Sequence, residues 1–295
     1  MFPIIPANTA TASANANGIF GYGISGTDVS MTNLVSNAGV VSSDVTGVGT
    51  ARKKLAATEY GGDKGIFGFG VTVSMTNLVS NAGVVATDVT GVGTARYLLA
   101  AATYGGDKGI FGFGDTASYC NICNLISNAG VVATDTSGIG QTRSSLGGCE
   151  YSDSKDKAIF AYGHTGSFTA VSNLVSNAGV VSSDVTGVGT IRDELAACRY
   201  STDKGIFGYG HTPSNVSMTN LVSNVGVIAS DTTGVGTARK GSAACEYGQD
   251  KGIFGFGSGG GYTAVTNLVS NTGVVSSDVT GVGTTRAFPA ACSYN

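Results

Sequence analysis

The sequence YGGDKGIFGFG occupies residues 60–70 and recurs unchanged at 104–114. Close variants follow: YSDSKDKAIFAYG at 151–163, YSTDKGIFGYG at 200–210 and YGQDKGIFGFG at 247–257. A copy without the opening Tyr, ANGIFGYG, stands at 16–23. The Ile of the phrase recurs every 44 to 49 residues. A period of this length predicts a fold built from stacked copies of one supersecondary unit.

Each repeat contains four short segments with strand-like composition. They are exemplified by YLLAAATY (97–104), KGIFGFG (64–70), TNLVSN (76–81) and GVVATDVTGV (83–92), with Gly- and Asn-rich turns between them. No segment has an apolar period of 3.6 residues over a helical length. We therefore predict an all-β fold over residues 17–295, a six-bladed β-propeller with four antiparallel strands per blade. An open solenoid of β units is the alternative.

The two ends of the chain carry complementary half-repeats. The first copy lacks its opening strand, and the C-terminal stretch RAFPAACSYN (286–295) supplies a strand of that kind. We predict that the C-terminal inner strand pairs with the N-terminal strand and closes the ring, residues near Ile19 lying beside Cys292. Residues 1–16, which begin MFPIIP, fall outside the repeats and are predicted to be an N-terminal arm.

Side-chain alternation within the repeated phrase suggests how neighbouring sheets stack. We expect Phe67 and Phe69 on one face of their strand, and Gly68 and Gly70 on the other. The aromatic rings of one sheet would then enter the glycine face of the next.

The repeat resembles the Kelch repeat over about residues 17–295. The resemblance rests on the period of about 47 residues, the IFGFG strand and the Arg before each inner strand. The Trp of that family is absent, and its Gly-Gly doublet is reduced to one Gly. The text TNLVSNAGVVATDVTGVGTAR (76–96) is also similar to uncharacterised propeller-like proteins of cyanobacterial bacteriophages and other aquatic viruses. This second resemblance implies a virion component.

Composition excludes several classes of function. Charged residues make up only 12% of the 295 residues, and the formal net charge is −3. A chain with so little basic charge lacks the electrostatic footprint of a nucleic-acid-binding protein. No apolar run is long enough for a membrane helix, and the N-terminal stretch has no Lys or Arg before its short apolar start, so we expect neither membrane insertion nor a signal peptide.

The loops that follow the IFGFG strand vary most between repeats. We expect them on the rim around the mouth of the central channel, together with the GVGT loops. If the chain binds a ligand, we expect it there. The alternative is that these solvent-exposed loop tips vary in sequence without a functional role. The candidate ligand-binding residues on this rim are Asp28, Asp115, Tyr119, His164, Phe168, His211 and Tyr262.

One Arg per repeat precedes the inner strand. These residues form a predicted structural ring of Arg52, Arg96, Arg143, Arg192, Arg239 and Arg286. Six guanidinium groups around a mouth could hold an anion. Because an Asp stands eight residues before each Arg, we favour an ion pair or loop clamp within the repeat, such as Asp88 with Arg96.

The cysteines and histidines suggest no chemistry of their own. Cys149, Cys198, Cys245 and Cys292 share one inner-strand position that is Thr or Ala in the other repeats, which indicates packing by reduced thiols. Cys120 and Cys123 form a lone C-x-x-C, too little for a zinc site. Because no catalytic constellation breaks the repeat symmetry, we expect no catalytic residues, no metal, no cofactor and no enzymatic activity.

The predicted function is that of a non-enzymatic structural or attachment protein of a virion, made in the host cytoplasm and displayed on a tail, fibre or capsid. Its partners would be other virion proteins, bound through the N-terminal arm, and protein or other contacts on the host surface. The alternative is a lectin-like propeller that recognises a host surface glycan. With no Trp available, Tyr119, Phe168 and Tyr262 would have to serve as sugar platforms.

Overall fold

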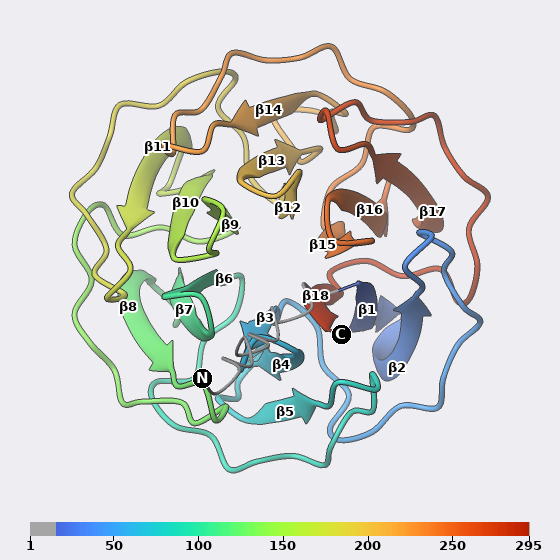
Figure 1. Cartoon of the computed structure of the whole chain (residues 1–295), viewed down its shortest axis with the longest axis horizontal. Helices are drawn as coiled ribbons and strands as arrows, with labels where there is room; N and C mark the ends of the chain where they lie inside the picture. The colour runs from blue at the N-terminus through green and yellow to red at the C-terminus, as the bar shows by residue number, and fades with distance from the viewer. Residues whose placement is uncertain (1–15, 295) are drawn as a thin grey trace, which may run out of the picture.

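In a computed structural model that describes residues 16–294, the chain forms eighteen β-strands and, over those residues, no helix. The strands make six antiparallel three-stranded sheets around a common axis (Figure 1). From the inner strand outward, the first two sheets are β18 (Ala290–Tyr294), β1 (Asn17–Ser25) and β2 (Thr27–Val35), then β3 (Ala56–Tyr60), β4 (Lys64–Gly68) and β5 (Thr76–Val79). The next two are β6 (Ala100–Tyr104), β7 (Lys108–Asp115) and β8 (Tyr119–Ile126), then β9 (Gly147–Tyr151), β10 (Lys157–His164) and β11 (Phe168–Val175). The last two are β12 (Ala196–Tyr200), β13 (Lys204–Gly208) and β14 (Thr219–Val222), then β15 (Ala243–Tyr247), β16 (Lys251–Ser258) and β17 (Tyr262–Val269). The all-β prediction is confirmed, and the architecture is propeller-like.

The outermost segment of each repeat differs from the prediction of a fourth strand. In the first repeat it touches β2 only through isolated bridges, Thr32 with Val45 and Val35 with Val41. Side chains take over the bonds between them: Asn33 Nδ2 donates to the Ser42 carbonyl at 3.0 Å, and the Leu34 amide donates to Ser42 Oγ at 2.9 Å. Each sheet therefore has three strands, with an outer segment held by a few backbone hydrogen bonds and by side chains between them.

The first and last strands of the described chain belong to one sheet. β18 pairs antiparallel with β1, and Ile19 lies opposite Cys292. A second link joins the chain ends, because the Thr284 amide donates to Asp44 Oδ2 at 2.9 Å across 240 residues of sequence. Residues 1–15 of the predicted arm lie outside the described residues. Its last residue, Ala16, accepts a hydrogen bond from the Gly248 amide at 2.8 Å.

Neighbouring sheets stack through aromatic rings and glycines, as Phe67 shows. Its ring meets Tyr22 of the preceding sheet at 5.1 Å, and a Cβ placed on Gly21 would lie 2.8 Å from that ring. The second aromatic behaves otherwise than predicted. Phe69 has φ 64°, which turns its ring to the opposite face, where it meets Phe111 of the following sheet at 5.1 Å. In the corresponding position of the first sheet, Tyr22 sits at a bulge.

The core lies between the sheets, in six clusters of buried apolar side chains. All six cysteines are free thiols and buried. Within residues 16–294, nothing helical offers a span long and apolar enough to cross a bilayer.

Candidate functional site

A closed ring of hydrogen bonds surrounds the axis at the end of the molecule where the inner strands begin. Each member donates its amide to the carbonyl of the equivalent residue in the preceding repeat, at 2.7–3.1 Å. The members are Lys54, Leu98, Ser145, Glu194, Gly241 and Phe288, and all have φ between 51° and 58°. A left-handed conformation costs a non-glycine residue about 1–2 kcal/mol. The side chains differ at every position and line a cavity of about 70 Å³, so a strained but regular backbone presents a variable surface.

A row of half-buried rings extends along the rim beside this mouth, across neighbouring sheets. Tyr119 begins β8, and its hydroxyl lies 2.9 Å from His164 Nδ1 at the end of β10. His164 meets the Phe168 ring at 5.4 Å, and Phe168 meets His211, which follows β13, at 5.7 Å. The Gly166 amide donates to His164 Nδ1 at 3.2 Å, so this nitrogen acts as an acceptor.

The row ends at a group of titratable side chains. His211 Nδ1 lies 3.6 Å from Asp193 Oδ1, too far for a hydrogen bond. Burial, with the neighbouring Glu194, raises the pKa of Asp193 to about 7. Burial, with the nearby Lys240, lowers the pKa of His211. Near neutral pH the histidine is therefore mostly uncharged and Asp193 is partly protonated, and Asp193 Oδ1 has no hydrogen-bond partner among residues 16–294.

The remaining candidates on this rim do not join the row. Asp28 forms an ion pair with Lys53 at 3.0 Å. Asp115 accepts a hydrogen bond from the Ala117 amide at 2.8 Å, which caps its own loop. Tyr262 begins β17 and is 41% exposed. The structure thus joins four of the seven predicted residues in the row, Tyr119, His164, Phe168 and His211, and places Asp115 opposite Tyr119 in the β7–β8 pair.

The six arginines are buried between sheets and do not face the mouth. Arg143 stacks on Phe113 of β7 at 4.2 Å and donates to Asn173 of β11, so it joins two sheets. The six arginines stand 3.9–4.4 Å from such a ring.

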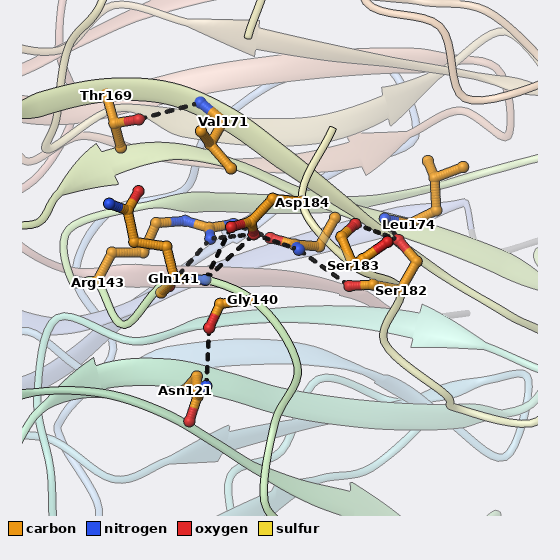
Figure 2. Close-up of polar contacts among 11 residues, drawn as sticks. Asn121, Gly140, Gln141, Arg143, Thr169, Val171, Leu174, Ser182, Ser183 and Asp184 are labelled. Atoms are coloured by element: carbon orange, nitrogen blue, oxygen red, sulfur yellow. Dashed lines mark hydrogen bonds and ion pairs between the residues drawn. The ribbon is translucent and has the colours of Figure 1, made fainter. Parts of the chain in front are cut away.

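The carboxylate partner of each arginine is not the one predicted. Arg143 lies 4.0 Å from Asp184 of the following sequence repeat (Figure 2). Asp135, eight residues before Arg143, instead lies 4.0 Å from Arg96. Asp184 also accepts the Gln141 amide at 3.0 Å. Burial lowers the pKa of Arg143 to about 10, so it remains charged at neutral pH. Each pair clasps a connecting loop to the next outer segment.

A charged cluster in the central channel escaped the sequence analysis. Glu59, Glu150 and Glu246 occupy the same inner-strand position in three sheets. Each stands directly before the tyrosine that opens the repeated phrase, and all three are buried. Lys155 reaches them from the β9–β10 turn, with its Nζ 2.8 Å from Glu59 Oε2 and 3.0 Å from Glu246 Oε2. The one signal in the sequence was the two-residue insertion SDSKD at 152–156.

The comparisons with known proteins concern the fold. No family model matches the chain, and no curated protein matches its sequence. A solved structure with a similar fold is a novel fungal alcohol oxidase with catalytic diversity among the AA5 family, in complex with copper. The TM-score is 0.56 at 13% identity, over 92% of this chain and 64% of the oxidase chain. This chain therefore spans less than two thirds of that protein.

This similarity corrects the prediction that the chain is not an enzyme. A protein with a similar fold is an oxidase, so neither the fold nor its repeat symmetry excludes catalysis. The residues described here nevertheless do not fit a copper centre. Copper favours imidazole and thiolate ligands, and the ring of Phe168 stands between the two histidines. Burial raises the pKa of the Cys120 and Cys123 thiols, that of Cys123 to about 11.

Proposed function

We propose that this chain is an attachment protein, a closed six-bladed propeller whose variable rim contacts a surface outside the particle that carries it. The observation that carries the proposal is the row from Tyr119 to His211, which breaks the repeat symmetry on one rim. The pairing of β18 with β1 supports the closed ring, in which the outer segments stand in place of fourth strands.

A glycan is the ligand class that the row favours. Half-buried Tyr119 and Phe168 offer ring edges and faces to the apolar face of a sugar, and the His and Asp groups beside them offer hydrogen-bond partners. The rings are already held by one another, so little side-chain entropy is lost on binding.

A glycan array tests the rim. We expect binding by the intact protein, and a loss of tenfold or more for Tyr119→Ala and Phe168→Ala, because each removes a contact ring. Tyr262→Ala is the matched control, since this tyrosine lies on the same rim outside the row. If no glycan binds, or if all three variants bind equally, the glycan proposal fails.

The proposal of display on a virion rests on the resemblance of the repeat text TNLVSNAGVVATDVTGVGTAR (76–96) to propeller-like phage proteins. The N-terminal arm, residues 1–16, is proposed to dock the propeller on other virion proteins through MFPIIP. Mass spectrometry of purified particles should find the full chain. Deletion of residues 2–15 should remove it from particles while its thermal unfolding stays unchanged. Incorporation of the deleted form would contradict the docking role.

A further inference from the structure

The six residues that precede the inner-strand tyrosines surround the axis and break the sixfold symmetry. They are Glu59, Thr103, Glu150, Arg199, Glu246 and Ser293, and all are buried. One carboxylate oxygen from each of the three glutamates lies within 4.8 Å of the others. Oxygen ligands of one Ca²⁺ ion, each 2.3–2.6 Å from the metal, are separated by about this distance or less.

In this structure the ammonium of Lys155 fills the space between these carboxylates. It contacts Glu59 and Glu246 directly. Although burial opposes a charged amine, the nearby Glu59 and Glu246 raise the pKa of Lys155, so it remains an ammonium. Arg199 holds the inserted turn in place by donating to the Ser152 and Asp153 carbonyls at 3.5 and 3.4 Å.

One carboxylate of the cluster keeps an unpartnered oxygen, although Arg199 lies 3.7 Å from Glu246 Oε2. Glu246 is 1% exposed, and its Oε1 accepts no hydrogen bond. The same residues line a cavity of about 30 Å³, enough for about two water molecules.

We propose that the glutamates form a cation site that the chain fills with its own Lys155, and that the site takes a divalent cation such as Ca²⁺ once this ammonium is removed. The three carboxylates are hard oxygen ligands, which suit Ca²⁺ rather than a metal that prefers nitrogen or sulfur, and the cavity leaves room for water ligands. With Lys155 in place, its charge excludes the metal. Lys155 thus serves as a tethered counter-ion that closes this end of the channel.

The test measures thermal unfolding in EDTA and in 5 mM CaCl₂ for the wild type and for Lys155→Ser. We expect no response to Ca²⁺ from the wild type. The variant should have a lower Tm in EDTA and gain about 5 °C or more in CaCl₂, because metal that binds only the folded state stabilises it. Lys157→Ser, which removes the exposed lysine at the start of β10, two residues after Lys155, is the matched control and should not respond.

Two further variants separate the site from general salt effects. Lys155→Arg keeps a cation in the channel and should not respond to Ca²⁺. Lys155→Ser combined with Glu59→Gln and Glu246→Gln removes two ligands and should lose the response. A wild type that binds Ca²⁺ as tightly as Lys155→Ser, or a Lys155→Ser protein that is indifferent to Ca²⁺, overturns the proposal. So does a variant that folds in neither buffer, because bound metal would restore the missing charge.

Discussion

At the scale of single residues, a change in one repeat is matched by a change in its neighbour. A Cβ placed on Gly205 would lie 2.6 Å from Cys149 Sγ of the preceding sheet, so a cysteine on the inner strand requires a glycine opposite. One interface departs from this rule on both sides: Ala102 replaces the cysteine and Ala158 replaces the glycine, in one buried cluster. The methyl group of Ala158 occupies the volume that the missing sulfur leaves.

This compensation predicts a non-additive mutant pair. Ala102→Cys should destabilise the protein by about 1–3 kcal/mol, because the sulfur overpacks against Ala158. Ala158→Gly should also destabilise, by leaving a void and loosening a strand. The double variant should be more stable than the sum of the single changes, since it recreates the pairing of Cys149 with Gly205. Urea unfolding of all four proteins measures the coupling, and additive changes would contradict the packing explanation.

At the scale of elements, side chains add to the few backbone hydrogen bonds that attach each outer segment, because no continuous strand ladder forms there. Asn173, with no exposed surface, donates to the Ser182 carbonyl at 3.0 Å and to Asp184 Oδ1 at 2.9 Å. The Asp184 carboxylate in turn accepts a hydrogen bond from the backbone amide of Gln141, in the loop that leads into the same sheet. One polar group therefore joins a strand, an outer segment and a connecting loop, and equivalent contacts recur around the ring.

The fastening of the outer segment can be tested at two adjacent serines. Ser182 Oγ accepts the Leu174 amide at 2.9 Å, whereas Ser183 is exposed and offers only its carbonyl to Ser182. Ser182→Ala should cost about 0.5–1.5 kcal/mol of unfolding free energy. Ser183→Ala should cost almost nothing. Amide exchange at Leu174 should accelerate only in the first variant, and equal effects of both changes would argue against this contact.

At the scale of the whole molecule, the ring brings together charges that are remote in sequence. Lys155 and Glu59 are 96 residues apart, and their contact lies across the axis channel. Buried ion pairs of this kind contribute little net stability, but loss of one partner is costly because it strands the other charge. Burial raises the pKa of Glu150, and it raises that of Glu246 to about 7.

These raised pKa values predict how stability depends on pH. The folded state holds protons on Glu246 that the unfolded state releases at its ordinary pKa of 4.5, so this contribution is lost as pH rises from 4.5 through about 7. Thermal unfolding should show a Tm that falls between pH 5 and pH 8. Glu246→Gln, which cannot ionise, should flatten that fall. An unchanged slope in the variant would show that Glu246 does not carry the effect.

At acidic pH, the dependence of stability on pH comes from the Asp residues that accept hydrogen bonds from a loop of another repeat. Although burial opposes it, hydrogen bonds from Thr284 and Asn33 lower the pKa of Asp44, and Thr50 and Asn77 act in the same way on Asp88. Their contribution is present above the ordinary Asp value of 3.8 and is lost as pH falls below it. Stability should therefore be greatest between about pH 4 and pH 5.

The repeated phrase was sufficient to predict the all-β class and the sixfold period, because strand alternation and turn residues act over a few neighbouring positions. The loop after the phrase also placed four residues on one rim, since His164 and His211 are the first residue of that loop and Tyr119 and Phe168 are the fifth. The face on which the Phe69 ring lies was predicted wrongly, because its positive φ reverses the alternation of side chains between the two faces of a regular strand. The Arg–Asp partners were missed because equal spacing fits pairing within a repeat or between repeats.

The sequence by itself determined the unit: which residues form strands, where they turn, and how many copies follow one another. Only the tertiary structure decided what the copies do to each other. The clasp of Arg143 to the next Asp, the row of rings along the rim and the reach of Lys155 to Glu59 all join residues from different repeats. Such contacts depend on the rotation between neighbouring sheets, a quantity that packing of rings against glycines sets and that no local pattern of residues contains.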